Sequence, residues 1–316
     1  MNDARNDGEA KQGRRKLLGC MAWVGTGLLW TVSGGVPRTI GLLGTARAAQ
    51  PMPGLTFAQI SDSHIGFSRD PNTDTPATLK AALDLVAAQH PAMLLHTGDV
   101  SHLSRPEQFD IATQLIGATG IETHYVPGEH DWLEDDGRPF VARFQKGTQQ
   151  GAPDGGFYSF DRDGLHFIGL NNVADLKAGG LGALGARQLD WLTSDLAGRS
   201  ASTPIVVFAH IPLWVVYRDW GWGTEDGAQA LALLRRFGSV TVLNGHIHQI
   251  MQKVEGNVAF HTARSTAFPQ PAPGTASSPG PMKVEPGRLR DMLGVASVTF
   301  TRGQSRLAVV DTPLGA

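Results

Sequence analysis

Seven side chains of the kinds that bind metal ions follow apolar segments at five separate places in the chain. They are Asp62 and His64 in ISDSH, Asp99 in HTGDV, Glu129 in PGEHD, His210 in FAHIP, and His246 and His248 in NGHIH. A ligand set of histidine and carboxylate without thiolate favours first-row divalent metals or iron. The pattern therefore predicts a metal site, provided that the five places meet in space.

Each of these residues also has an ordinary structural explanation when taken alone. Asp99 would be a turn residue after Gly98, and Asp62 would cap a helix or turn. The joint pattern favours a site, because several independent segments would each have to end in a ligand type by accident. Four histidines stand outside the pattern and are interpreted as packed or surface residues: His96, His124, His166 and His261.

The segments that must position these residues alternate between strand-like and helix-like patterns. Strands are expected at 55–60, 93–97, 123–126, 157–160, 165–170, 204–209, 240–244, in a hairpin within 251–263, and at 295–300 and 306–311. Helices are expected at 76–89 behind a Thr75-Pro76 cap, at 105–116 behind a Ser104-x-x-Glu107 capping box, and at 186–197 and 225–237.

Strand-helix alternation followed by a run of strands implies an α/β fold, with a mixed sheet or two packed sheets and helices outside. Ligand sites in such folds lie beyond the carboxyl ends of strands, where the candidate residues fall. Gly98, Gly128 and Gly245 would permit the sharp strand exits that this requires. The Pro/Gly/Ser-rich segment 268–287 is expected to be a long loop.

The charge of the chain is unevenly distributed. The first 48 residues hold seven Lys/Arg and three Asp/Glu out of totals of 27 and 29, so residues 49–316 carry 20 basic and 26 acidic residues, a net charge of −6. That balance argues against non-specific binding to nucleic acid or anionic membranes. Cys20 is the only cysteine, which excludes a disulfide or thiolate metal site from the remainder.

Residues 1–48 are typical of an export signal. An Arg14-Arg15 pair precedes an apolar run at 17–36, and Ala46-Arg47-Ala48 is a candidate cleavage site. The twin-arginine export machinery is therefore an expected partner, and a periplasmic or otherwise exported location is predicted for a domain at 49–316. A retained membrane anchor is the alternative, but the glycines in the run favour cleavage and no lasting membrane span.

Five short motifs occur in the order found in the calcineurin-like metallophosphoesterases. They are D-x-H at 62–64, G-D at 98–99, G-x-H-D at 128–131, H-x-P at 210–212 and G-H-x-H at 245–248. Over roughly residues 55–262 the chain most resembles the bacterial cyclic-nucleotide phosphodiesterase branch. The resemblance implies a four-layer αββα sandwich of two mixed sheets flanked by helices, around a two-metal centre.

The resemblance also implies roles for the candidate residues. Asp62, His64 and His248 would hold one metal ion, His210, His246 and Glu129 the other, and Asp99 would bridge them. The ions would be manganese, iron or zinc, and would activate a bridging hydroxide for attack on the phosphorus of a small phosphorylated substrate. His130 would be the catalytic histidine, stabilising charge or protonating the leaving oxygen.

Two positions depart from the family pattern. Glu129 stands where the family normally has an asparagine, and His102 stands where it commonly has an aspartate that orients the catalytic histidine. Three carboxylates and a hydroxide sum to −4 and cancel two divalent ions, whereas a neutral asparagine in place of Glu129 would leave +1 for an anionic substrate. Either one ion is ferric, or a protonated His102 pairs with Glu129.

Three functions fit these observations. The favoured one is an exported phosphodiesterase; the others are a phosphomonoesterase and a weakly active or inactive protein that binds metal and a phosphorylated ligand. No specific nucleic-acid partner is expected. The aromatic residues after His210 would line the site or pack its loop, and Trp214 and Trp222 are the candidate substrate contacts.

Overall fold

The computed structural model describes residues 54–145, 150–152, 155–304 and 306–316, together with three strands near the N-terminus. Those strands, β1 (Trp23–Val24), β2 (Leu28–Ser33) and β3 (Val36–Gly41), form an antiparallel sheet within a unit that ends at Met52. The rest of the predicted export signal at 1–48 lies outside the described residues. In the described part of the chain, no helix is long and apolar enough to cross a membrane.

The second unit begins at Pro53 and contains two mixed β-sheets. The larger sheet has seven strands in the order β12 (Gln252–Glu255), β13 (Val258–Thr262), β11 (Val240–Asn244), β10 (Ile205–Ala209), β9 (Leu165–Leu170), β8 (Phe157–Arg162) and β7 (Gln150–Ala152). Its four central strands, from β13 to β9, are parallel, and the outer strands run antiparallel to their neighbours.

The smaller sheet has five strands in the order β15 (Ala308–Pro313), β14 (Gly294–Thr299), β4 (Thr56–Ile60), β5 (Leu94–His96) and β6 (Thr123–Tyr125). Strands β4, β5 and β6 are parallel neighbours. The two C-terminal strands extend this sheet antiparallel on the other side of β4. Three parallel strands therefore end side by side at one edge.

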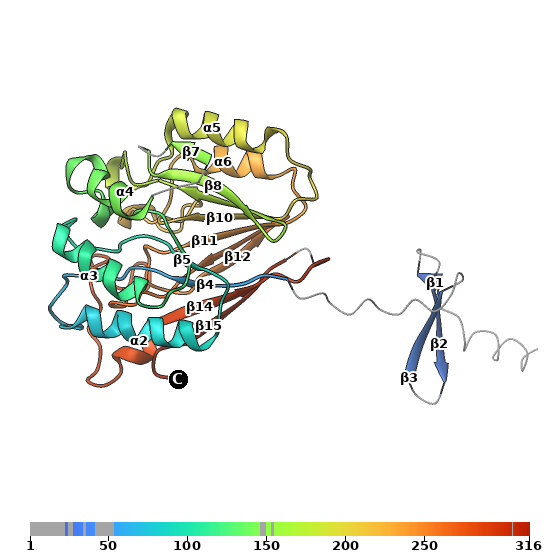
Figure 1. Ribbon diagram of the computed structural model, residues 1–316, viewed down its shortest axis with the longest axis horizontal. Coiled ribbons are helices and arrows are strands. Elements are labelled where there is room, and N and C mark those ends of the chain that lie inside the picture. Colours follow the sequence, from blue (N-terminus) through green and yellow to red (C-terminus); the bar gives the residue numbers. More distant parts are fainter. Residues whose placement is uncertain are drawn as a thin grey trace, which may run out of the picture. The chain divides into compact units, whose positions relative to one another are not determined.

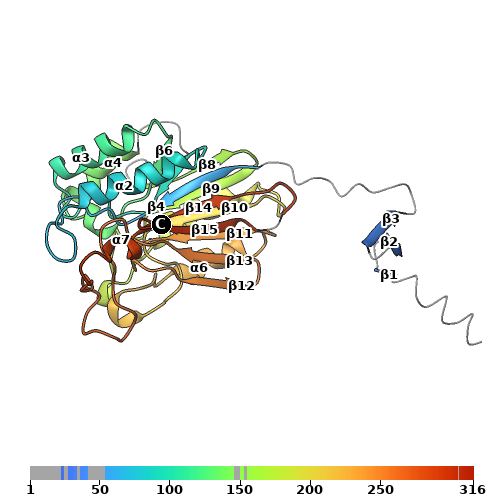
Figure 2. The ribbon, with the colours of Figure 1, turned by 90° about the horizontal axis from the view of Figure 1, so that it is seen from below.

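Helices cover the outer face of each sheet. Figure 1 shows α5 (Gly185–Ala197) and α6 (Gly227–Leu234) over the larger sheet and α2 (Thr75–Ala88) against the smaller one. Figure 2 shows α3 (Pro106–Gly117) and α4 (Arg138–Phe144) beside α2. The short α7 (Leu289–Met292) follows the segment 268–287, which is a long loop without helix or strand, as expected from its composition.

Three layers of apolar side chains hold these elements together. One lies between the sheets, where Phe57 of β4 meets Phe167 of β9 edge to face with ring centroids 5.4 Å apart. A second layer joins the smaller sheet to α2, α3 and α4, and a third joins the larger sheet to α5 and α6. The predicted four-layer αββα sandwich is thus confirmed.

Two of the predicted helix caps are wrong. Asp74, not Thr75, caps α2, because its carboxylate accepts a hydrogen bond from the backbone N–H of Ala77 at 3.0 Å. Ser104 does not cap α3; its hydroxyl donates to the carbonyl of His130 at 2.8 Å. The same hydroxyl accepts from the backbone N–H of Leu133 at 3.1 Å, so both its donor and an acceptor lone pair serve the loop after β6. The sequence analysis also missed α4, α7 and β7.

Candidate metal centre

The seven predicted ligands all follow the carboxyl ends of parallel strands. Asp62 and His64 follow β4, Asp99 follows β5, and Glu129 lies in a 3-10 turn (η1, Glu129–Asp131) after β6. On the larger sheet, His210 follows β10, and His246 and His248 follow β11. The ligands carried by the smaller sheet contact those carried by the larger sheet. Both sheets therefore place their ligands at the same end of the sandwich.

One group of ligand atoms combines Asp62 and His64 with His248. The Nε2 atom of His248 lies 3.2 Å from Oδ1 of Asp62 and 3.3 Å from Nε2 of His64. All three side chains are buried. The ring of His248 is fixed by a hydrogen bond from its Nδ1 to the carbonyl oxygen of Phe268 at 2.5 Å, which leaves Nε2 directed at the group.

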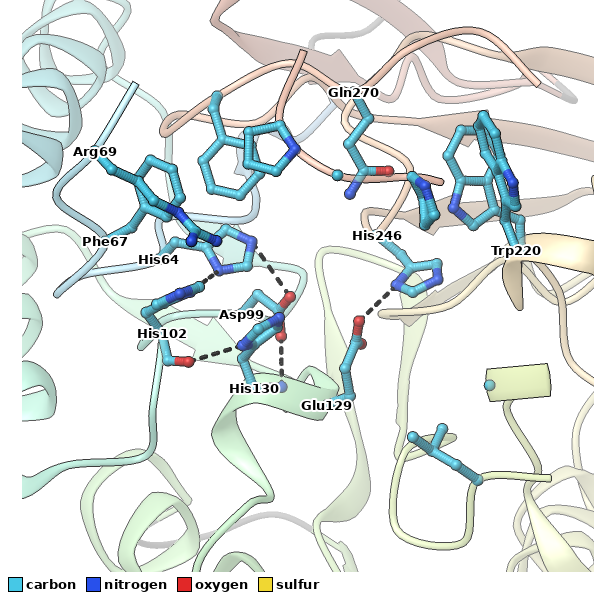
Figure 3. A pocket seen from close by; sticks show the side chains of 17 residues that line it. His64, Phe67, Arg69, Asp99, His102, Glu129, His130, Trp220, His246 and Gln270 are labelled. Carbon is cyan, nitrogen blue, oxygen red and sulfur yellow. Dashed lines mark hydrogen bonds and ion pairs between the residues drawn. The ribbon is translucent and has the colours of Figure 1, made fainter. Parts of the chain in front are cut away.

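A second group combines Glu129 with His210 and His246. Oε2 of Glu129 lies 3.0 Å from Nε2 of His210, and Oε1 lies 3.0 Å from Nδ1 of His246. The ring of His210 donates from Nδ1 to the carbonyl of Thr97 at 2.7 Å, so its Nε2 also faces the group. Figure 3 shows Glu129 and His246 pointing toward each other across the pocket.

Asp99 lies between the two groups. Its Oδ2 atom is 3.4 Å from Nε2 of His64 and 3.4 Å from Nε2 of His210. Its other oxygen, Oδ1, accepts a hydrogen bond from the backbone N–H of His130 at 3.0 Å. The carboxylate is therefore oriented by η1 while its free oxygen faces histidines of both groups, which is the position expected of a shared ligand.

The ligands leave their strands through unusual backbone conformations. Positive φ angles between 40° and 69° occur at five of the seven ligands: Asp62, His64, Asp99, His246 and His248. Such left-handed conformations are uncommon outside glycine and cluster at functional sites. At these residues the backbone has left the extended conformation of the strand. The left-handed turns, and not the alternation of side chains along a strand, therefore direct the ligand side chains toward the site.

The glycines next to these residues serve two different purposes. Gly98 has a φ of +96°, so it makes the sharp exit predicted from the sequence. Gly128 does not adopt a positive φ; instead it provides space, because a Cβ atom there would lie 2.0 Å from Oδ1 of Asp99. Both glycines allow the carboxylate of Asp99 to reach its position.

Several buried polar atoms of the site lack hydrogen-bond partners among the described residues. They are Oε2 of Glu129, Nε2 of His210, and both ring nitrogens of His246. Buried polar groups in proteins are normally satisfied, and orphaned ones need an explanation. Lone pairs of imidazole and carboxylate that converge without donors fit cations such as manganese, iron or zinc. The residues present therefore fit metal binding.

His130 is the middle residue of η1 and lies beside both groups. Its Nδ1 donates to the carbonyl oxygen of His102 at 2.7 Å, which leaves Nε2 as the nitrogen available to a ligand. Burial lowers its pKa, but the carboxylates of Asp99 and Glu129 and the carbonyl of His102 outweigh burial and raise it. These neighbours therefore favour the protonated form of the imidazole.

The hypothesis that a protonated His102 pairs with Glu129 is wrong. The ring of His102 stacks on that of His130, with centroids 4.8 Å apart, and its Nδ1 lies 3.3 Å from Nδ1 of His64. Burial and the neighbouring His130 lower the pKa of His102 to about 4, so the ring is neutral. Figure 3 shows His102 beside His64, with Glu129 on the other side of His130.

A cavity of about 310 Å³ opens over these groups and is lined by ligands of both, by aromatic side chains and by the long loop. Trp222 lines it but is almost completely buried. Trp214 does not line it; its ring packs against Phe260, with centroids 4.8 Å apart. Trp220, which was not among the candidate contacts, lines the cavity instead.

The four histidines excluded from the pattern have other partners. The rings of His124 and His261 pair with Glu122 and Asp311, and His166 lies between two aspartates. Nε2 of His96 lies 2.9 Å from the Ser63 hydroxyl. None of the four belongs to a metal-binding group among the described residues.

A model of calcineurin-like phosphoesterases matches residues 55–250, more than half of the chain. The chain belongs to this family. It is 28% identical to a 3′,5′-cyclic-nucleotide phosphodiesterase of Nostoc sp. over 225 residues, 68% of this chain and 79% of that protein. It is 25% identical to the glycerophosphodiester phosphodiesterase GpdQ of Enterobacter lignolyticus over 189 residues, 58% of this chain and 65% of that protein.

Solved structures of this calcineurin-like fold agree with the architecture. A dimetal phosphatase from Danio rerio superimposes with a TM-score of 0.58 at 15% identity, covering 82% of this chain and 99% of the other. A purple acid phosphatase from yellow lupin gives a TM-score of 0.59 at 13% identity, covering 91% of this chain and 57% of the other. These identities are low, so the structural likeness establishes the fold alone.

Asp131 helps to order the site, a role that was not predicted from the sequence. The buried carboxylate of Asp131 accepts hydrogen bonds from the backbone N–H groups of Val100, Ser101 and Gly128, at 2.8 to 3.1 Å. It thereby ties the loop after β5 to the loop after β6. In the sequence, Asp131 is marked only by its position next to His130. That position does not show that backbone N–H groups about 30 positions earlier in the chain would donate to its carboxylate.

Substitution of His102 tests its contact with His64. A histidine that binds a metal ion through Nε2 carries its proton on Nδ1, so His64 as such a ligand would donate to Nδ1 of His102, 3.3 Å away. His102→Phe keeps a ring against His130 but removes the acceptor, and should weaken manganese binding about 10- to 100-fold in isothermal titration calorimetry. His102→Asn retains an acceptor oxygen and should lose less. Equal affinity in wild type and His102→Phe would refute the contact.

Proposed function

We propose that this protein is an exported, dinuclear metal-dependent phosphoesterase that prefers small phosphodiesters. One observation carries the proposal. Two groups of His and carboxylate ligand atoms share Asp99 and open, together with the ring of His130, into one cavity. A lone metal-binding cluster would not account for a shared carboxylate with the imidazole of His130 beside it.

Asp62, His64 and His248 would hold one ion, and Glu129, His210 and His246 the other, with Asp99 common to both. Two bound divalent ions supply Lewis-acid polarisation of phosphoryl oxygens and a nucleophilic water at neutral pH. The protein's own task is to hold its ligands in fixed directions. The hydrogen bonds from Nδ1 of His210 and His248 to backbone carbonyls do this, because they direct each Nε2 inward.

His130 would act on the leaving group. Its Nδ1 proton is committed to the carbonyl of His102, so Nε2 is the atom that can donate a proton to a departing oxygen or stabilise the charge that builds on phosphorus. The raised pKa supports this role, since a donor must hold its proton at neutral pH. In this chain a backbone carbonyl does the orienting for which the family commonly uses an aspartate.

The substrate would be a small phosphodiester. The cavity volume of about 310 Å³ is at the lower end of the range for small-molecule sites. The Nostoc and Enterobacter relatives carry names of diesterases, one acting on cyclic nucleotides and one on glycerophosphodiesters. Cyclic nucleotides are mainly cytoplasmic, so glycerophosphodiesters are the more suitable substrate class for an exported protein. A phosphomonoesterase is the closest alternative activity.

The ligand types and the charge balance of the site narrow the identity of the metal ions only in part. Manganese, iron and zinc all suit the donor set. A ferric ion paired with a divalent one would restore the positive charge that Glu129 cancels. Iron in half of the sites of fully active protein would support that pairing, whereas full activity with divalent ions alone would exclude it.

The decisive assay uses residues 49–316 loaded with manganese, iron or zinc and supplied with p-nitrophenyl phosphate and its bis-ester. We expect faster hydrolysis of the bis-ester. His130→Ala should lower kcat about 10²- to 10⁴-fold, the usual contribution of a general acid, with metal content unchanged by elemental analysis.

Leu133→Ala serves as a matched control, because it changes an exposed side chain just beyond η1. Its activity should equal that of the wild type. A fully metallated wild type that releases no p-nitrophenol from either ester would instead favour the alternative, a protein that binds metal and a phosphorylated ligand without turnover.

We further propose that residues 1–48 direct export by the twin-arginine route and are then removed, leaving no membrane span. The Arg14-Arg15 pair, the glycine-containing apolar run and Ala46-Arg47-Ala48 support this. Export of a folded chain also suits a centre whose ligands are spread over two sheets, because the ions can be loaded before transport.

Expression of the full chain in a bacterium with a twin-arginine system tests export. We expect periplasmic protein that begins at Ala49, by N-terminal sequencing. Changing both Arg14 and Arg15 to Lys should retain uncleaved protein in the cytoplasm, whereas Arg5→Lys should have no effect. Full-length wild-type chain in the cytoplasm or membrane fraction would contradict the proposal.

A further inference from the structure

The charge of the centre leaves a binding problem that the metal ligands do not solve. Asp62, Asp99 and Glu129 together with a hydroxide nucleophile balance two divalent ions, so the cluster has no surplus positive charge for an anionic substrate. Pairing of Glu129 with His102 does not supply it, because the partners of Glu129 are His210 and His246. If both ions are divalent, the missing positive charge would have to come from another cation near the cavity.

Arg69 is the only lysine or arginine among the described residues that line the cavity. Its guanidinium lies over the ring of Phe67, 5.4 Å from the centroid. That ring in turn meets the ring of His102 edge to face, with centroids 5.3 Å apart. Figure 3 shows the guanidinium reaching toward His64, on the side of the cavity opposite Glu129.

The backbone that carries Arg69 is held in place from several sides. The N–H of Asn72 donates to the carbonyl of Arg69 at 2.9 Å, closing a tight turn. The buried side chain of Asn72 then donates to the Thr78 hydroxyl at 2.9 Å and to the carbonyl of Ala267 at 2.7 Å. The turn is thus fastened to α2 and to the segment before the long loop.

The guanidinium itself is uncommitted. Within the described residues, no hydrogen bond or ion pair joins it to another side chain or to a carbonyl; the side chain is exposed, and its backbone is held by the turn. Arginine offers paired donors that match two oxygens of a phosphate, and such charge-assisted bonds are strong. An unpaired arginine carried by a held turn, beside ligands whose two divalent ions would leave no surplus charge, is suited to hold an anion that those ions would attract only weakly.

We propose that Arg69 is a substrate-binding residue that holds the anionic oxygens of the phosphoester and replaces the positive charge cancelled by Glu129. The proposal rests on the phosphoesterase function proposed above and names the group that binds its substrate. It assigns the cavity to monoanionic phosphodiesters that fit between Arg69 and the aromatic side chain of Trp220.

The test measures binding of inorganic phosphate to manganese-loaded protein by isothermal titration calorimetry, and KM and kcat with the bis-ester. Arg69→Gln should weaken phosphate binding about ten- to hundredfold. With the bis-ester, kcat/KM should fall because KM rises, while kcat changes little. Arg69→Lys, which keeps the charge but loses the paired donors, should lie between it and the wild type.

A charge-matched variant gives the sharpest control. Combining Arg69→Gln with Glu129→Asn restores the net charge of the wild-type site, so phosphate affinity should recover relative to Arg69→Gln alone, with manganese content verified by elemental analysis. Arg302→Gln removes an exposed arginine that follows β14. The last residue of β14, Thr299, pairs with Thr56 at the start of β4, so Arg302 follows the strand end opposite to the site. Arg302→Gln should leave phosphate binding unchanged.

The outcomes separate this inference from the function on which it rests. Hydrolysis with the same KM and the same phosphate affinity in wild type and Arg69→Gln would overturn the role of Arg69 and leave the phosphoesterase standing. Absence of hydrolysis in every variant, with phosphate binding still weakened by Arg69→Gln, would overturn the enzyme and support the anion site.

Discussion

The site depends on the convergence of buried carboxylates and imidazoles from two sheets at one edge. Asp62 and Asp99 are carried by the smaller sheet and His210 by the larger one, yet their ligand atoms lie within 4.8 Å of one another. Burying such groups without compensation is costly. Cations bound between the sheets would offset that cost, so the same ions that serve chemistry would also join the two halves of the sandwich.

Departures from the family pattern have distinct consequences in this structure. Glu129 lies 3.0 Å from ring nitrogens of two histidines of one group, and it would cancel the surplus charge of a centre with two divalent ions. His102 offers its carbonyl to His130 and its ring nitrogen to His64, so one residue links the predicted catalytic imidazole to a predicted metal ligand. Arg69, supplied by a separate turn, is the basic side chain among the described residues that line the cavity, and under our proposal it would restore the positive charge there.

The sequence was sufficient for most of the strands and helices and for the prediction that the ligand residues meet at strand ends, because both follow from local patterns and from the rule that sites lie there. The division of the ligands into two groups came from the family resemblance. The sequence was insufficient where the partner is distant in the chain. Ser104 resembles a helix cap in sequence but bonds to the carbonyl of His130. Trp214 and Trp220 differ by six positions, yet one packs on Phe260 and the other lines the cavity, a distinction that only the path of the loop decides.

The most direct test of the central claim is an anomalous difference map, measured at the manganese edge, from crystals of the metal-loaded protein. We expect two peaks, one among Asp62, His64 and His248 and one among Glu129, His210 and His246, with Asp99 contacting both. A single peak, or a peak held instead by His64, His102 and His130, would contradict it.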